Sequence, residues 1–140
     1  YLIAASLNGV LAQRLVRRIC PKCKQPYQVP ENMRKYVERA GISQDEMFYG
    51  AGCENCRNSG YVGRVGIYEL LIIDDNFRDM INKDSSVSNM RRAFRRSGRD
   101  SLFDDGIKKI KAGLTTIEEV LRVTEIYGQS EEEVFVENMD

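Results

Sequence analysis

Apolar positions at the start of the chain repeat with a helical period. Hydrophobic side chains stand three or four positions apart from the first residues onward, at Leu2, Ile3, Leu7, Val10, Leu11, Leu15 and Ile19. This spacing is typical of one broad face of an amphipathic helix, and it predicts a helix over residues 1–18. Three arginines in its last turns would then lie at the negative end of the helix dipole: Arg14, Arg17 and Arg18.

One later segment has the composition of a β-strand. Residues 60–73 are rich in β-branched and aromatic side chains and are interrupted by glycines, which predicts a turn followed by a buried strand. Start and stop signals make the rest helical. Between the first two segments, Pro30 opens a helix that Gly41 ends, and Ser43 starts a short helical turn.

Four further helix starts follow the strand, at Asp74 or Asp75, at Ser85 or Ser86, at Ser101, and at Thr115 or Thr116. The second of these helices would turn Val87, Met90 and Phe94 inward. The last start contains two overlapping capping boxes, in which Thr115 pairs with Glu118 and Thr116 pairs with Glu119. It would bury Ile117, Val120, Leu121 and Thr124.

The chain has four cysteines, in two Cys-x-x-Cys pairs, and no histidine: Cys20, Cys23, Cys53 and Cys56. One such pair places two thiolates within reach of one ion, and two pairs complete a tetrahedral zinc site of four thiolates. Four sulfur ligands leave no open coordination position, so the predicted zinc is structural and not catalytic. Lys22, Lys24 and Arg57 would offset the negative charge of the zinc–thiolate group.

Disulfides and redox chemistry are the alternatives for these cysteines. Disulfides suit a secreted protein, but no segment resembles a signal peptide. A redox dithiol needs only one Cys-x-x-Cys pair and usually opens a helix in a βαβ context. The 21 basic residues balance the 21 acidic ones, so overall charge gives no case for a nucleic-acid or membrane partner. Paired cysteines without secretory features indicate the cytoplasm.

Six segments, taken in order, resemble the C-terminal region of the secretion and pilus-assembly ATPases (the GspE/PulE/PilB family), the motors of type II secretion and type IV pilus assembly. They are GVLAQRLVR (9–17), CPKC (20–23), GCENC (52–56), GYVGRVGIYELL (60–71), DGIKK (105–109) and GLTTIEEVLRVT (113–124). The resemblance covers nearly the whole chain up to Glu125. Any one segment alone would be weak, but the ordered set is highly specific.

The resemblance implies a hexameric motor that is cytoplasmic and peripheral to the bacterial inner membrane. Such a motor hydrolyses ATP with Mg²⁺ and contacts inner-membrane platform proteins and neighbouring subunits of the homo-hexamer. The cysteines fill all four positions of the family's metal motif. Retraction motors of the pilus lack this cysteine lobe, so its presence favours the secretion or extension branch.

The expected fold class is α+β, mostly α: a tetracysteine zinc-knuckle lobe, a short strand and a small C-terminal helical bundle. Residues 1–19 would be the terminal helix of an upstream RecA-like ATPase domain, and residues 20–60 the tetracysteine metal-binding lobe. The strand and helical bundle would occupy residues 61–126, and an acidic tail without stable order residues 127–140. We therefore expect the chain to be the C-terminal part of a larger ATPase.

The sequence contains no Gly-x-x-x-x-Gly-Lys-Ser/Thr phosphate loop. Without that backbone cradle and lysine, the chain alone is expected to hydrolyse no ATP. It also offers no credible pair of acid and base side chains, so no catalytic residue and no nucleotide-binding residue is predicted.

Two other functions stay open at this point. One is a free-standing zinc-ribbon module that binds nucleic acid, for which an arginine cluster over residues 91–99 would be the basic face. The same cluster is more typical of a solvated helix face than of a site for an anionic partner. The other function is a thiol oxidoreductase, which requires cysteines that exchange disulfides.

Overall fold

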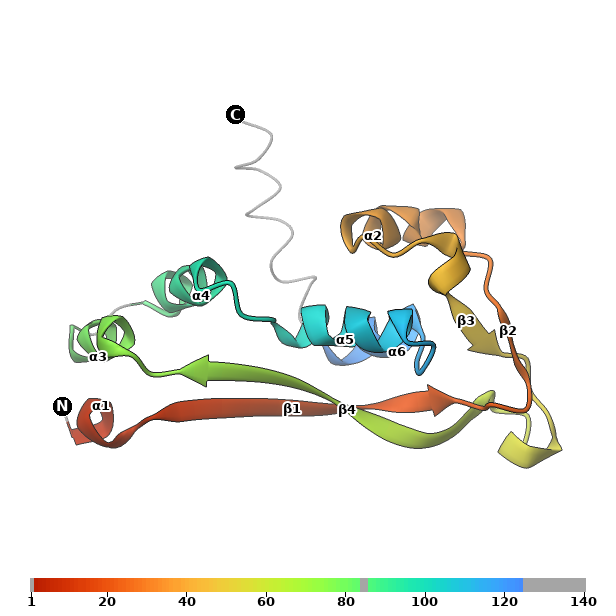
Figure 1. The fold of residues 1–140 in the computed structure, drawn as a ribbon, viewed down its shortest axis with the longest axis horizontal. Helices are drawn as coiled ribbons and strands as arrows, with labels where there is room; N and C mark the ends of the chain where they lie inside the picture. Colours follow the sequence, from red (N-terminus) through yellow and green to blue (C-terminus); the bar gives the residue numbers. More distant parts are fainter. Residues whose placement is uncertain (1, 84–85, 125–140) are drawn as a thin grey trace.

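The computed structural model describes residues 2–83 and 86–124. The fold class is α+β with helix predominating, as the sequence predicts. A long two-stranded ribbon runs along the molecule, and most of the helices lie on one side of it (Figure 1). The predicted acidic tail, residues 127–140, lies outside the described residues. In the described part of the chain, no helix has the length and apolarity to span a membrane.

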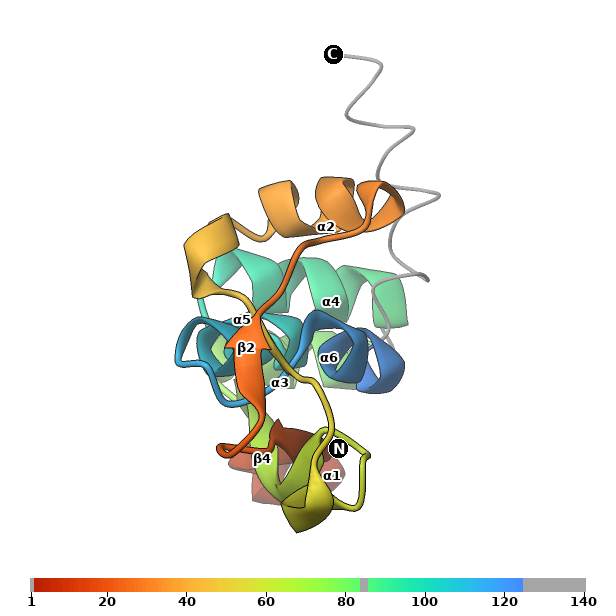
Figure 2. The same ribbon diagram turned by 90° about the vertical axis from the view of Figure 1, so that its right-hand side faces the viewer.

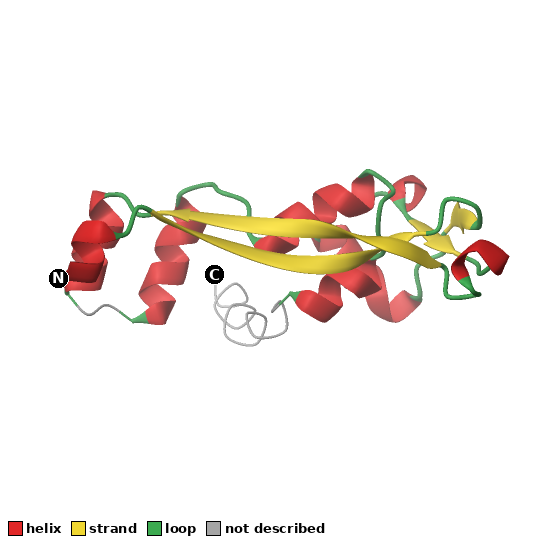
Figure 3. Ribbon diagram, turned by 90° about the horizontal axis from the view of Figure 1, so that it is seen from below, coloured by secondary structure: helices red, strands yellow, loops and turns green. Residues whose placement is uncertain are grey.

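The ribbon pairs β1 (Gly9–Ile19) with β4 (Tyr61–Ile72) in antiparallel register, from Gly9 opposite Ile72 to Arg17 opposite Arg64. Figure 3 shows the two strands twisting around each other over much of the molecule's length. A register shift between Arg17 and Ile19 marks the end of β1 that leads to the cysteines.

The helix predicted over residues 1–18 is therefore wrong beyond α1 (Leu2–Ser6). The apolar spacing did fit a helix, but a partner strand of matching length was available in β4. An unpaired β4 would leave a row of backbone N–H and C=O groups without partners, and β1 satisfies them. Arg14, Arg17 and Arg18 lie in β1, so the prediction that they oppose a helix dipole is wrong as well.

The strand predicted at residues 60–73 is present as β4, but the prediction that it is buried is wrong. Within β4 only Ile67 is buried, and residues such as Val62 and Leu70 are exposed. A two-stranded ribbon has no further strand or second sheet to cover it, which accounts for this exposure.

A second, short ribbon joins β2 (Lys24–Pro26) and β3 (Phe48–Gly50), which the sequence did not predict. Strands of three residues are too short to show a period. Between them lie η1 (Glu31–Met33), α2 (Arg34–Arg39) and η2 (Gln44–Glu46). The predicted helix start at Pro30 and the helix end at Gly41 are confirmed, and the Ser43–Glu46 capping box is formed.

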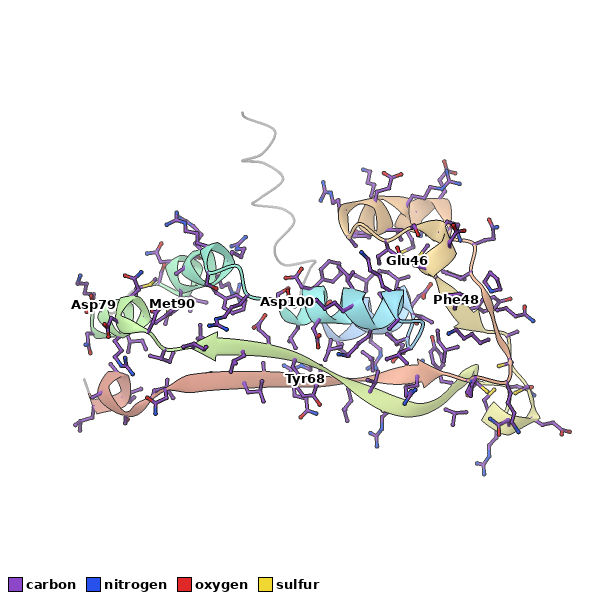
Figure 4. All side chains as sticks on the ribbon, in the orientation of Figure 1. Glu46, Phe48, Tyr68, Asp79, Met90 and Asp100 are labelled. Atoms are coloured by element: carbon purple, nitrogen blue, oxygen red, sulfur yellow. The ribbon has the colours of Figure 1, made fainter. Side chains whose placement is uncertain are left out.

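The four helix starts predicted after β4 are confirmed. Asp74, Ser86, Ser101 and Thr116 each accept a hydrogen bond from the first turn of α3 (Asp75–Asn82), α4 (Val87–Arg96), α5 (Leu102–Lys111) and α6 (Ile117–Val123), respectively. Val87 is a correction, because it is 65% exposed and not turned inward. Figure 4 labels Met90, on the helix that Val87 begins.

One hydrophobic core connects the segment between the cysteine pairs with the C-terminal helices. It contains Val37, Ile42 and Met47 from the first part and Ile107, Ile110, Ile117, Val120 and Leu121 from α5 and α6. Figure 2 shows α2 stacked over these helices. The predicted division at residues 60 and 61 stays a prediction, and the parts on either side of it share this core.

Glu119 ties α6 to the ribbon. Its carboxylate is 3% exposed and accepts hydrogen bonds from the backbone N–H of Arg17 at 2.8 Å and from the Arg17 guanidinium at 2.9 and 3.0 Å. Arg122 donates to the same carboxylate at 2.9 Å. The Arg17 guanidinium also lies 4.2 Å from the centre of the Tyr61 ring, on β4. One buried carboxylate therefore fixes α6 against both strands.

This use of Glu119 replaces one capping box predicted for α6. Thr116 Oγ1 accepts from the Glu119 N–H, but the Glu119 carboxylate turns to Arg17 and not back to the cap. The other box is also absent, since Thr115 Oγ1 donates to the Arg17 carbonyl at 2.8 Å and Glu118 accepts from the Tyr27 hydroxyl. The residues of both boxes connect α6 to distant segments.

The same contacts change the acidity of Glu119. Burial alone would raise the pKa of its carboxyl group, but the hydrogen bonds from Arg122 and Arg17 outweigh burial and lower the pKa from 4.5 to about 2. A lowered carboxyl pKa stabilises the fold above pH 4.5, and this stabilisation is lost as the pH falls toward 2. The difference between these two pKa values corresponds to a contribution on the order of 3 kcal/mol to the free energy of unfolding at neutral pH.

We predict that Glu119→Gln lowers the free energy of unfolding by about 2–3 kcal/mol at pH 7, because the amide keeps the shape but loses the charge. Denaturant unfolding at a series of pH values measures this. The difference between the two chains should shrink as the pH falls from 4.5 toward 2. Glu38→Gln, at an exposed position on α2, is the control and should change stability little. A difference that stays constant over this pH range would contradict the assignment.

Candidate metal centre

The cysteine pairs lie at the two places where the long ribbon passes into the short one. Cys20 and Cys23 occupy the turn between β1 and β2. Cys53 precedes and Cys56 ends the short helix η3 (Glu54–Cys56) between β3 and β4. This is the end of the molecule opposite α1 (Figure 1). Four strand ends therefore converge on the four sulfurs.

The four sulfurs lie close enough together to surround one metal ion. All four Sγ atoms lie within 4.8 Å of one another. The separations are 3.7 Å for Cys20–Cys53, 3.8 Å for Cys23–Cys56 and 3.7 Å for Cys53–Cys56. Zinc–sulfur bonds of about 2.3 Å place the corners of a tetrahedron about 3.8 Å apart. These distances are far longer than a disulfide bond, and all four cysteines are free.

The backbone around the second pair donates hydrogen bonds to sulfur. The N–H groups of Cys53 and Gly60 both donate to Cys56 Sγ at 3.3 Å, and that of Gly52 donates to Cys23 Sγ at 3.3 Å. The Asn55 side-chain amide donates to Cys20 Sγ at 3.5 Å. N–H donors of this kind orient metal-binding groups and stabilise negative charge on sulfur.

These contacts set the acidity of the thiols. The Asn55 amide lowers the pKa of the Cys20 thiol below its ordinary 9.0. Burial raises the pKa of Cys56, but the Cys53 and Gly60 N–H donors outweigh it and bring the pKa down to about 6. Burial dominates at Cys23 and raises the pKa of that thiol to about 11. Thiolates are the form that binds metal, so the N–H donors at Cys20 and Cys56 favour the metal-binding form of these two side chains.

The charge offset expected from Lys22, Lys24 and Arg57 stays a prediction. Lys24 Nζ lies 4.5 Å from the centre of the Phe48 ring, labelled in Figure 4, and Lys22 and Arg57 are exposed. Among the described residues, the direct N–H donors to the sulfurs belong to Gly52, Cys53, Asn55 and Gly60. No pattern in the sequence pointed directly to this role for the two glycines and the asparagine.

A close approach of two backbones holds the ribbons together beside the sulfurs. A Cβ atom at Gly50 would lie 2.0 Å from the Gly60 carbonyl oxygen, and one at Gly60 would lie 2.4 Å from that of Gly50. Gly60 also has φ +80°, which favours glycine. Any larger residue at either position would push β3 away from the start of β4, and with it one cysteine pair.

Backbone hydrogen bonds connect the sulfur cluster to its surroundings. Cys20 N–H donates to the Gly60 carbonyl at 2.9 Å, and Ala51 N–H donates to the Cys23 carbonyl at 3.0 Å. One residue before Cys20, the Ile19 N–H donates to the Leu114 carbonyl at 2.9 Å, just ahead of α6. The cluster, both ribbons and the start of α6 therefore form one hydrogen-bonded frame.

The four cysteines could hold a metal ion, and a full set of sulfur ligands would leave no position for a substrate. A charged hollow lies beside Tyr68 and Asp100, labelled in Figure 4. Four of the charged side chains that line it form two ion pairs, Lys108 with Asp100 and Lys109 with Asp105. The arginines over residues 91–99 are exposed. Neither region adds a catalytic arrangement.

Known proteins resemble this chain over most of its length. The family model described as "Type II/IV secretion system protein" matches residues 1–122. Type II secretion system ATPase E of Vibrio cholerae is 41% identical over 124 residues, which cover 89% of this chain and 24% of the relative. Type II secretion system protein E of Pseudomonas aeruginosa is 45% identical over 124 residues, with the same coverage.

The similarity extends to pilus assembly. Type IV pilus assembly ATPase PilB of Thermus thermophilus is 43% identical over 124 residues, which cover 87% of this chain and 14% of the relative. The chain thus spans less than a quarter of the length of these three relatives. Because the family model matches residues 1–122, the chain belongs to the family of type II/IV secretion system proteins.

Proposed function

We propose that Cys20, Cys23, Cys53 and Cys56 bind one structural zinc ion. The observation that supports this most strongly is the tetrahedral spacing of their sulfurs, 3.7–3.8 Å for the three pairs in contact. The N–H donors around the sulfurs suit thiolate ligands, and the described residues near them include no imidazole, since the chain has no histidine. Four soft ligands in this arrangement are typical of zinc.

Zinc would supply no step of a reaction here, since its coordination would be complete. Its role would be to hold the turn after β1 against the turn after β3, which are far apart in the sequence. The backbone frame would then carry this constraint to α6 through Ile19 and Leu114, and to the ribbon through Gly60. The metal would stabilise the fold by closing a long loop.

We further propose that the chain is the C-terminal part of a hexameric motor ATPase that powers type II secretion or type IV pilus assembly. The names of the relatives support an ATPase of one of these systems. ATP and Mg²⁺ would bind in the remainder of the parent protein, because residues 1–140 contain no phosphate loop. This part would be structural and would mediate contacts.

In the same proposal, the parent is cytoplasmic and lies at the inner membrane. Its partners would be platform proteins of the secretion or pilus machine and neighbouring subunits of the homo-hexamer. The equal numbers of basic and acidic residues favour these protein partners over nucleic acid.

We predict that Cys20→Ser removes most of the bound zinc and lowers the free energy of unfolding by about 3 kcal/mol or more, because three sulfurs complete a tetrahedral site poorly. Elemental mass spectrometry measures the zinc content, and thermal unfolding measures the loss of stability. The control is Ala51→Ser, which places a hydroxyl on an exposed neighbouring residue and keeps all four sulfurs. A Cys20→Ser chain with unchanged zinc content and unfolding temperature would show that the four-sulfur site is wrong.

A second prediction concerns ATP. The purified chain should release no phosphate from Mg²⁺-ATP above the buffer background, since nothing in its sequence can cradle the phosphates. A phosphate-release assay tests this, with the full-length Vibrio cholerae ATPase as the positive control. Steady hydrolysis that follows the chain through purification would contradict the proposed placement of the nucleotide site.

A further inference from the structure

We propose that Cys53 is the reactive sulfur of the zinc centre, the position at which a soft electrophile modifies the site and releases the metal. This inference rests on the zinc-binding function proposed above. It follows from two differences between Cys53 and the other three cysteines: its exposure and the hydrogen bonds to its sulfur.

Cys53 is the most accessible of the four. Cys20 is fully buried, and Cys56 and Cys23 are 6% and 8% exposed, whereas Cys53 is partly exposed to solvent. It stands between Gly52, which has no side chain to cover it, and the exposed Glu54 at the start of η3. A reagent in solution can therefore reach this sulfur while the fold is intact. The buried Cys20 sulfur can be reached only after the fold has opened.

Cys53 Sγ also has weaker N–H contacts than the other sulfurs: the Cys56 N–H faces it in a capping box, but without a direct hydrogen bond. Cys20 Sγ accepts from the Asn55 amide, Cys23 Sγ from the Gly52 N–H, and Cys56 Sγ from the N–H groups of Cys53 and Gly60. Within residues 2–83 and 86–124, the direct hydrogen-bond partners of Cys53 Sγ are the sulfurs of Cys20 and Cys56, each at 3.7 Å.

This difference matters for a sulfur bound to zinc. An N–H donor draws electron density from a thiolate and occupies one of its lone pairs, so it lowers the tendency of that sulfur to attack an electrophile. A zinc-bound Cys53 thiolate would keep its lone pairs available on the side that faces solvent. Access and electron density therefore favour the same residue.

The chemical step is an ordinary substitution. With iodoacetamide, the Cys53 thiolate attacks the methylene carbon, a sulfur–carbon bond forms, and the carbon–iodine bond breaks with iodide leaving. The product is a neutral thioether, which is a much weaker zinc ligand than a thiolate. Three thiolates remain, so the zinc is held less tightly and the second cysteine pair is freed from the first.

The experiment treats the zinc-loaded chain with a limiting amount of iodoacetamide and maps the labelled peptides by mass spectrometry, while a chromogenic chelator follows zinc release. We expect the first label on Cys53 and loss of zinc in step with it. In the chain unfolded with denaturant and chelator, the four cysteines should react at similar rates. This control shows that the preference for Cys53 comes from the fold and not from the reagent.

Asn55→Ala tests the part played by the hydrogen bonds. It removes the donor to Cys20 Sγ and leaves the four sulfurs in place, so Cys53 should still be labelled first, because Cys20 stays fully buried in the zinc-loaded chain. Asn32→Ala, at an exposed amide in η1, is the matched control and should keep the pattern of the unsubstituted chain.

The outcomes separate the two proposals. A zinc-loaded chain labelled first on Cys20, Cys23 or Cys56 would overturn this inference and leave zinc binding intact. A first label on Cys20 in Asn55→Ala would show that the N–H donors outweigh exposure, and it would overturn the part that exposure plays in this inference. A chain that purifies without zinc and binds none when it is added would overturn the proposed function, and this inference with it.

Discussion

The convergence of four strand ends on four sulfurs is the constraint on which the rest of this structure depends. β1 and β4 form a long ribbon with little cover, since only Val16, Ile19 and Ile67 of its residues are buried. Such a ribbon is not stable by itself. One end of it is held where the cysteine pairs meet and where Gly50 and Gly60 touch. A metal ion at that point would fix the register of both ribbons at once.

The second constraint is electrostatic, and it lies next to the first along the chain. Glu119 binds the backbone and guanidinium of Arg17, two residues before Ile19, which is itself hydrogen-bonded to Leu114. The sulfur cluster and α6 are therefore connected through a few residues of β1. In this member of the family of type II/IV secretion system proteins, the long ribbon, the sulfur cluster and α6 therefore form one hydrogen-bonded frame.

The sequence allowed the clustering of the four cysteines and most helix ends to be predicted, because these depend on local residue types. Cys-x-x-Cys pairs, the caps at Asp74, Ser86 and Ser101, and the stop at Gly41 act within a few residues of themselves. The prediction failed where a distant partner decides. Residues 9–19 have a helical spacing but pair with β4, and Glu119 could cap its own helix but binds Arg17. The donors Gly52, Asn55 and Gly60 depend equally on tertiary contacts.

X-ray absorption spectroscopy at the zinc edge of the purified chain tests the central claim most directly, because it counts the atoms around the metal and measures their distances. The account predicts a single shell of four sulfur atoms at about 2.3 Å, with no nitrogen or oxygen neighbour. A shell that includes nitrogen or oxygen, or fewer than four sulfurs, would contradict the closed four-thiolate centre from which the architecture has been explained.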